Sequence, residues 1–250
     1  MTRLSLPLSL LLASLASVAL AHPIPISGSP PEPVEKPSLQ EILDDLVVSG
    51  PPIDANAPSG IELFESTESP MVVQLVFNFL NPGNLFAFGM YDADDPDNLV
   101  WLLPESFDPS HLVTVSFSAD GTIAIDNGWV STGGAGFDGP FGFFIKRRNP
   151  GETPVYFFSE SDLNGGTDRV KVFQGDGSQT LQFPGLDPEL FLSDQFLLAW
   201  EAGIGGQNDG GFDDFIVSVK AITAVPEPAA LLLLGLSVGA LARMRRARQY

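Results

Sequence analysis

Short runs of β-type residues, separated by turn-forming sequences, are the feature that most restricts the fold of this chain. The runs are rich in Val, Ile, Leu and Phe, and they cover residues 71–80, 85–91, 112–118, 122–126, 141–146, 155–158, 170–174, 196–201 and 215–220. Asn-Gly, Asp-Gly and Asn-Pro-Gly sequences, which favour tight turns, lie between many of them. Strands at this spacing with no helical pattern between them predict an all-β fold, an antiparallel sandwich of jelly-roll type.

The clearest hairpin begins at residue 112. Val113, Val115 and Phe117 alternate with polar residues, as in a strand with one buried face. Asp120 and Gly121 then predict a turn into a second alternating run.

One convincing helix precedes the strands. Ser38 and Glu41 have the spacing of a capping box, in which each side chain bonds to the backbone of the other residue. The helix is expected over residues 39–47, and its apolar face consists of Leu39, Ile42, Leu43 and Leu46.

Composition excludes several classes of protein. The chain has 250 residues, no Cys and two His, so thiol catalysis, iron–sulfur clusters, disulfides and Cys-based zinc sites are impossible. Its net charge of −19 argues against nucleic acid as a partner. His111 follows Pro109 and Ser110, and a polar loop residue is a simpler interpretation of it than a general base.

The N-terminus has the pattern of a secretory signal peptide over residues 1–21. Arg3 supplies the positive start, an apolar run follows, and Ala19 and Ala21 form a small-x-small cleavage site. A buried or membrane-spanning helix is the alternative interpretation. Residues 22–37 are rich in Pro and are expected to form an extended linker.

The C-terminus, residues 225–250, has three parts in a fixed order. Pro226, Glu227 and Pro228 come first, followed by an uncharged apolar stretch over residues 229–242. A basic cluster then contains Arg243, Arg245, Arg246 and Arg248. A helix over the apolar stretch reaches roughly 21 Å, which makes a marginal transmembrane span in a hydrocarbon core about 30 Å thick. The arginines are expected to stay on the cytoplasmic side.

This three-part terminus resembles the PEP-CTERM sorting signal of Gram-negative bacteria. The resemblance implies that exosortase, an integral membrane enzyme, reads and removes the segment. Processing by signal peptidase is expected at the other end, from the signal pattern of residues 1–21, and the apolar segment is expected to hold the precursor transiently in the inner membrane. Hosts of this signal generally make an extracellular polysaccharide matrix, which makes exopolysaccharide a further expected partner. An ordinary C-terminal membrane anchor is the alternative, although such an anchor does not require Pro-Glu-Pro.

A second resemblance, to the DUF4114 family, spans residues 38–223. The matching segments are residues 88–92, 141–145, 163–170, 198–201 and 212–217. The family is a domain of unknown function that is common in exported bacterial proteins. Its last element usually carries two further acidic residues, where this chain has Ala202 and Gly211.

The strongest candidate metal site is formed by Glu201, Asp209, Asp213 and Asp214. These carboxylates surround a Gly-rich turn and supply the hard oxygen ligands that Ca²⁺ prefers. Ca²⁺ takes about six to eight such ligands, and the two missing acidic residues weaken the match. The competing interpretation is that the Asp side chains cap backbone N–H groups of the turn.

Two further groups have both a structural and a functional interpretation. Asp92, Asp94 and Asp97 form either a solvated turn or a cation site. The three tryptophans form either core contacts or a platform on which sugars stack; Trp200 favours the core, Trp129 is the best exposed candidate, and Trp101 is the third.

The sequence therefore predicts a non-enzymatic, exported bacterial protein that exosortase sorts to the cell surface or an extracellular matrix, with no catalytic residue assigned. The alternative is a calcium-dependent carbohydrate-binding or adhesion module. A matrix glycosidase that uses carboxylates such as Glu201 and Asp209 is a third hypothesis.

Overall fold

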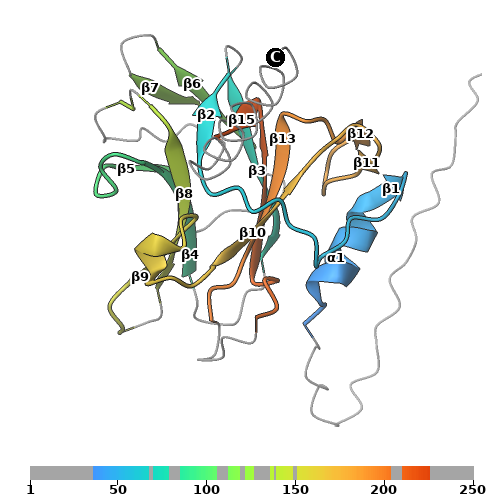
Figure 1. Ribbon diagram of the computed structural model, residues 1–250, viewed down its shortest axis with the longest axis horizontal. Helices are drawn as coiled ribbons and strands as arrows, with labels where there is room; N and C mark the ends of the chain where they lie inside the picture. Colours follow the sequence, from blue (N-terminus) through green and yellow to red (C-terminus); the bar gives the residue numbers. More distant parts are fainter. Residues whose placement is uncertain are drawn as a thin grey trace, which may run out of the picture. The chain divides into compact units, whose positions relative to one another are not determined.

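The structure is a computed structural model that describes residues 36–67, 70–78, 85–105, 112–118, 122–126, 136–137, 139–148, 151–203 and 210–225. These residues form one α-helix, one short 3-10 helix and three antiparallel sheets (Figure 1). The predicted all-β class with a single short α-helix is thereby confirmed.

The central sheet has six strands. Their spatial order is β10 (Val170–Gln174), β13 (Gln195–Trp200), β14 (Phe215–Lys220), β3 (Met71–Asn78), β6 (Leu112–Phe117) and β7 (Ile123–Asp126). The predicted hairpin is confirmed as β6 and β7, in which Phe117 lies opposite Ile123. Its turn at Asp120 and Gly121 lies outside the described residues.

The second six-stranded sheet, here called the outer sheet, packs against the central one. Its order is β15 (Ile222–Ala224), β2 (Phe64–Ser66), β8 (Phe141–Arg148), β4 (Leu85–Asp92) and β5 (Leu99–Leu103), with β9 (Val155–Phe158) also paired to β8. The 3-10 helix η1 (Asp162–Asn164) follows β9.

Aromatic side chains fill the space between these two sheets. Phe88 of the outer sheet meets Trp200 of the central sheet edge to face, with ring centroids 6.4 Å apart. Phe64 meets Phe196 in the same way at 5.3 Å. Such pairs add to the free energy of burying the rings, because the edge of one ring lies against the electron-rich face of the other. The prediction that Trp200 is a core residue is confirmed by its complete burial.

Helix α1 (Leu39–Leu46) and a small three-stranded sheet cover the other face of the central sheet (Figure 1). The small sheet consists of β1 (Val47–Ser49), β11 (Thr180–Leu181) and β12 (Glu189–Leu190). The capping box is present: the Ser38 N–H donates to Oε2 of Glu41 at 2.8 Å. All four predicted apolar positions of the helix are buried, and the helix ends at Leu46 because Val47 begins β1.

The chain passes from the central sheet to the outer sheet at Ala221. This residue separates β14 from β15 and has a φ of 61°. The left-handed conformation is costly for a residue with a Cβ atom. The carbonyl of Ala221 accepts a hydrogen bond from Oγ1 of Thr67 at 2.8 Å, which helps to hold the corner.

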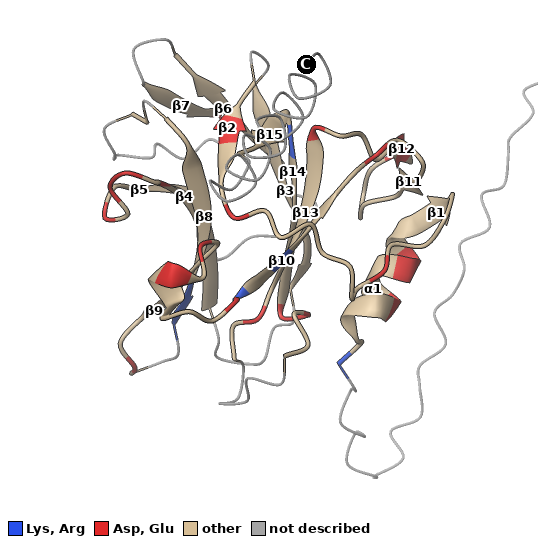
Figure 2. Cartoon of the chain, in the orientation of Figure 1, with Lys and Arg blue, Asp and Glu red and all other residues tan. Residues whose placement is uncertain are grey.

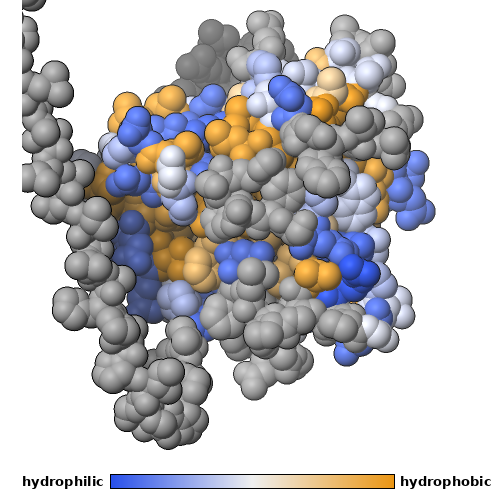
Figure 3. Space-filling model, turned by 180° about the vertical axis from the view of Figure 1, so that it is seen from behind, coloured by the Kyte–Doolittle hydropathy of each residue, from blue (hydrophilic) through white to orange (hydrophobic). Residues whose placement is uncertain are grey.

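Seen from behind, hydrophobic patches are broken up by hydrophilic residues (Figure 3).

Within the part of the chain that the structure describes, no helix has the length and apolar character needed to cross a membrane. The signal peptide (1–21), almost all of the linker (22–37) and the sorting segment from Pro226 onward lie outside the described residues.

Candidate functional site

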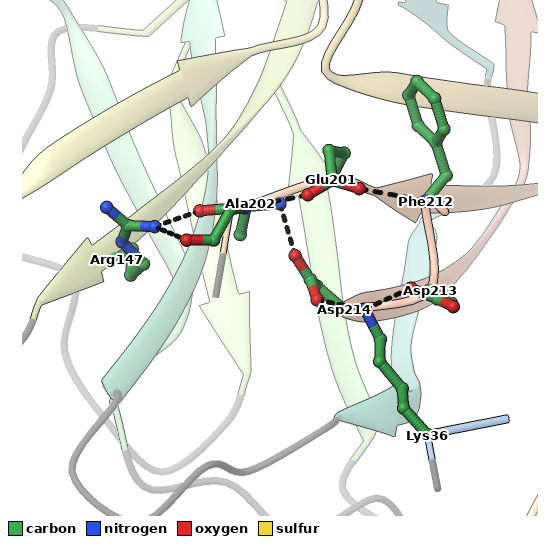
Figure 4. Close-up of polar contacts among 8 residues, drawn as sticks. Lys36, Arg147, Glu201, Ala202, Phe212, Asp213 and Asp214 are labelled. Carbon is green, nitrogen blue, oxygen red and sulfur yellow. Dashed lines mark hydrogen bonds and ion pairs between the residues drawn. The ribbon is translucent and has the colours of Figure 1, made fainter. Parts of the chain in front are cut away.

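The predicted acidic site lies where β13 and β14 meet at one end of the central sheet. Trp200 and Phe215 form the last pair of this ladder, and the Asp214 N–H donates to the Trp200 carbonyl at 3.2 Å. Glu201 follows β13 and Asp214 precedes β14 directly, so the ladder itself brings these two side chains together (Figure 4). Both residues are only 1% exposed.

Asp214 makes two kinds of contact. Its Oδ2 accepts a hydrogen bond from the Ala202 N–H at 2.7 Å, and its Oδ1 accepts one from Nζ of Lys36. Lys36 also forms an ion pair with Asp213 (Figure 4). A buried carboxylate requires such partners, because removing its charge from water costs several kcal/mol, on the order of 5.

Glu201 joins the two arms of the same turn. Its Oε1 accepts a hydrogen bond from the Gly203 N–H at 3.0 Å, and its Oε2 accepts one from the Phe212 N–H at 3.3 Å. These are the backbone-capping contacts that the turn interpretation predicts. On the other side, Nη1 of Arg147 donates to the carbonyls of Ala202 and Gly203.

The charge state of Lys36 follows from its surroundings. Burial lowers its pKa, but hydrogen bonds and charge attraction from Asp213 and Asp214 outweigh that effect, so the pKa lies above its usual value. Lys36 is therefore a cation at neutral pH, and its positive charge lies between the two carboxylates.

Ala202 and Gly211, which stand where the DUF4114 pattern has acidic residues, both lie where an acidic side chain would fit poorly. Ala202 is completely buried and packs into the core between the sheets, where an additional carboxylate would lack water. A Cβ atom at Gly211 would come within 2.7 Å of Oδ1 of Asp213. A side chain at residue 211 therefore competes with the observed position of the Asp213 carboxylate.

A cavity of about 350 Å³ lies beside this turn. Its polar lining includes Glu62, Asp168 and Lys171, and Phe212 forms part of its wall. Phe212 has a φ of 54°, an unusual conformation for a bulky residue, and its ring lies 4.9 Å from Nζ of Lys171. The Lys171 ammonium also donates to the Ala55 carbonyl at 3.0 Å, so it is held in place.

The segment with Glu201, Asp209, Asp213 and Asp214 is here called the acidic turn. Calcium binding at the acidic turn stays a prediction. Asp209 lies outside the described residues, and among those described no group of three or more His, Asp or Glu side chains is arranged to hold a metal ion. The contacts of Glu201 and Asp214 with backbone N–H groups are those of a turn.

The other sequence candidates have the following positions. Oδ1 of Asp92 accepts from the Asp94 N–H at 3.0 Å, which is a turn contact, and Asp97 is exposed in the same loop. Trp101 is half-buried on β5. Trp129 and His111 lie outside the described residues, as do Ala19, Ala21 and the residues of the sorting motif.

A buried polar cluster around Tyr91 has no counterpart among the residues predicted from sequence. Its hydroxyl donates to Oε2 of Glu160 at 2.8 Å and lies 3.3 Å from Oγ of Ser159. Burial raises the pKa of Tyr91 and of Glu160, and for Glu160 the nearby charges of Glu62 and Asp162 act in the same direction. No motif marks these residues, because they are brought together by strand pairing rather than by spacing.

Comparison with known proteins gave no match among family models, curated proteins or solved structures.

Proposed function

We propose that this chain is an exported, non-enzymatic bacterial protein that exosortase processes and that functions at the cell surface or in an extracellular polysaccharide matrix. The proposal rests on the two terminal segments of the sequence, which have the order and composition of export and sorting signals. Before processing, the apolar segment at residues 229–242 holds the precursor in the inner membrane, with the arginine cluster inside the cell.

The observation that carries the proposal is the position of the last described strand relative to the sorting motif. Strand β15 ends at Ala224, and the Val225 N–H donates to the Leu63 carbonyl at 3.0 Å. Pro226, the first residue of the sorting motif, comes next in the sequence. Cleavage at the motif would therefore remove none of the described strands.

The folded part supports a binding or structural role. The buried carboxylates of Glu201 and Asp214 are occupied by backbone N–H groups and, for Asp214, by Lys36. We propose a jelly-roll-like connectivity for the two packed sheets and membership of the DUF4114 family, on the sequence segments described above.

Localisation of sorting-motif variants tests the proposal. In a host that makes exosortase, the wild-type chain is expected outside the inner membrane, whereas Glu227→Ala is expected to accumulate in the membrane fraction. Glu152→Ala, an exposed acidic residue in a turn, serves as the control and should behave as wild type. Equal export of wild type and Glu227→Ala would overturn the proposal.

A calcium-dependent carbohydrate-binding or adhesion module is the second candidate. Its basis is the acidic sequence pattern of Glu201, Asp209, Asp213 and Asp214, three of which are buried where β13 and β14 end. A ligand that binds only the folded state raises its melting temperature. A melting temperature that calcium raises and a chelator lowers would support this candidate, and one that neither changes would contradict it.

A further inference from the structure

The outward face of the outer sheet carries a row of aromatic residues that crosses four strands. Trp101 of β5 lies opposite Gly89 of β4, Gly89 lies opposite Phe144 of β8, and Phe144 lies opposite Phe158 of β9. A Cβ atom at Gly89 would collide with the Phe144 ring. The glycine therefore lets the rings of Trp101 and Phe144 meet edge to face, with centroids 4.8 Å apart.

Tyr156 extends this row toward solvent. It lies opposite Lys146 in the pairing of β8 with β9, and its ring centroid is 6.0 Å from that of Phe144 and 6.3 Å from that of Trp101. Phe144 is completely buried, whereas Tyr156 is 38% exposed and Trp101 is half-buried. We call Trp101, Phe144, Tyr156 and Phe158 the aromatic face. The buried Phe144 ring packs against the rings of Tyr156 and Trp101 and holds them in place. These two side chains therefore lose little conformational entropy when a ligand binds.

Positive charge borders the aromatic face. Nζ of Lys146 lies 5.3 Å from the centroid of the Trp101 ring and donates to Oε1 of Glu105 at 2.9 Å. Arg148 donates to the other oxygen of the same carboxylate. Lys146 and Arg148 thus share the single carboxylate of Glu105, so these three side chains together carry one net positive charge beside the aromatic rings. The Arg148 side chain is 46% exposed.

This positive border is unusual in the chain. Lys146 and Arg148 lie on the outward face of β8, whereas Arg147 between them faces the other side and bonds to the carbonyls of Ala202 and Gly203. Elsewhere in this chain of net charge −19, acidic residues are spread over many elements (Figure 2). Charges farther away than the Debye length, about 8 Å at physiological salt, are largely screened. A ligand over Trp101 would therefore experience mainly the charge of Lys146 and its neighbours, while the Glu160 carboxylate lies near the Phe158 end, where it bonds to Tyr91.

We propose that the aromatic face and its basic border bind an acidic polysaccharide. The apolar C–H face of a uronic acid ring would pack on Tyr156 and Trp101, and its carboxylate would pair with Lys146 and Arg148. A neutral glycan would leave the cations without a new partner, and a purely apolar ligand would leave them desolvated. The inference rests on the proposed function for the extracellular location, and it names the class of polymer that the protein would meet there.

This interaction requires no calcium, which separates it from a calcium bridge at the acidic turn. The aromatic face lies on the outer sheet, whereas Glu201, Asp213 and Asp214 lie at the ends of β13 and β14 in the central sheet. A chelator therefore distinguishes the two modes of binding.

Calorimetric titration of the full-length chain with tetragalacturonate in the presence of EDTA tests the inference. Binding is expected, with cellotetraose as the weaker, neutral counterpart. Tyr156→Ala should weaken binding about tenfold, as loss of a central aromatic contact does. Glu105→Gln should strengthen binding, because it releases Lys146 and Arg148 from their shared carboxylate. Leu190→Ala, an exposed apolar residue on β12, is the matched control and should change nothing.

Absence of tetragalacturonate binding, binding that needs calcium, equal binding of cellotetraose, or an unchanged affinity in Tyr156→Ala would each overturn the inference. Because Tyr156 is 38% exposed, its replacement should cost less stability than that of the buried Phe144. A cooperative melting transition of Tyr156→Ala well above the titration temperature separates loss of binding from loss of fold. Failure here leaves the sorting proposal intact, because export is measured by the Glu227 variant and not by saccharide binding.

Discussion

Lys36 donates a hydrogen bond to Asp214, 178 positions further along the chain. The contact ties Lys36, two positions before the capping box of α1, to the residue directly before β14. It connects the start of the described fold with the last hairpin of the central sheet, across the acidic turn. Sequence spacing alone does not suggest this pair.

Replacement of Asp214 tests the structural role of the turn. Asp214→Asn removes the charge that pairs with Lys36 and weakens the hydrogen bond to the Ala202 N–H. We expect a loss of about 2–4 kcal/mol in the free energy of unfolding, measured by urea titration. Asp97→Asn, at an exposed position, should change stability by less than about 0.5 kcal/mol. Equal stability of both variants would contradict a structural role for Asp214.

The ion pair predicts a specific pH dependence. The pKa of Lys36 is raised above its ordinary value of 10.5, so its stabilising contribution is fully present below that value and is lost as pH rises through the folded-state pKa. Wild type should be more stable than Lys36→Met at about pH 8, and the difference should shrink at about pH 12. A difference that stays constant over this range would show that the charge of Lys36 does not contribute.

The corner between the two large sheets predicts a stabilising substitution. Ala221 has a φ of 61°, a conformation that glycine adopts without a steric penalty. Ala221→Gly should raise the free energy of unfolding by up to about 1 kcal/mol. Ala124→Gly, at an exposed position in strand β7, should have the opposite sign. Destabilisation by both substitutions would argue against a strained corner.

Packing on the outward face of the outer sheet depends on a second glycine. A Cβ atom at Gly142 would collide with the ring and hydroxyl of Tyr91. Gly142→Ala should therefore lower the melting temperature and cost about 1–3 kcal/mol. Gly139→Ala is the matched control, because a Cβ atom there has no heavy atom of the described residues within 4 Å, its two chain neighbours aside. A Gly142→Ala variant as stable as the control would contradict the observed position of Tyr91.

Much of the fold was predictable because most strands of four residues or more carry their own pattern. The strand at Val155–Phe158 and that at Phe215–Lys220 have the predicted bounds, and the capping box at Ser38 and Glu41 fixes the start of α1. Strands of two or three residues, such as β11 and β15, are too short to show alternation. They form because the chain is already held beside a partner strand.

The candidate site was only partly predictable for a related reason. Glu201, Asp213 and Asp214 are near one another in sequence, and a Gly-rich turn marks them. Lys36 comes from the predicted linker and Tyr91 meets Glu160 through strand pairing, so neither contact leaves a local signal. The half-exposed position of Trp101 likewise depends on the glycine opposite it in β4.

The intact mass of the protein recovered outside producing cells tests the central claim most directly. Exosortase processing predicts a chain that has lost the apolar segment at residues 229–242 and the arginine cluster behind it. Extracellular protein whose mass still includes Arg248, Gln249 and Tyr250 would contradict the account.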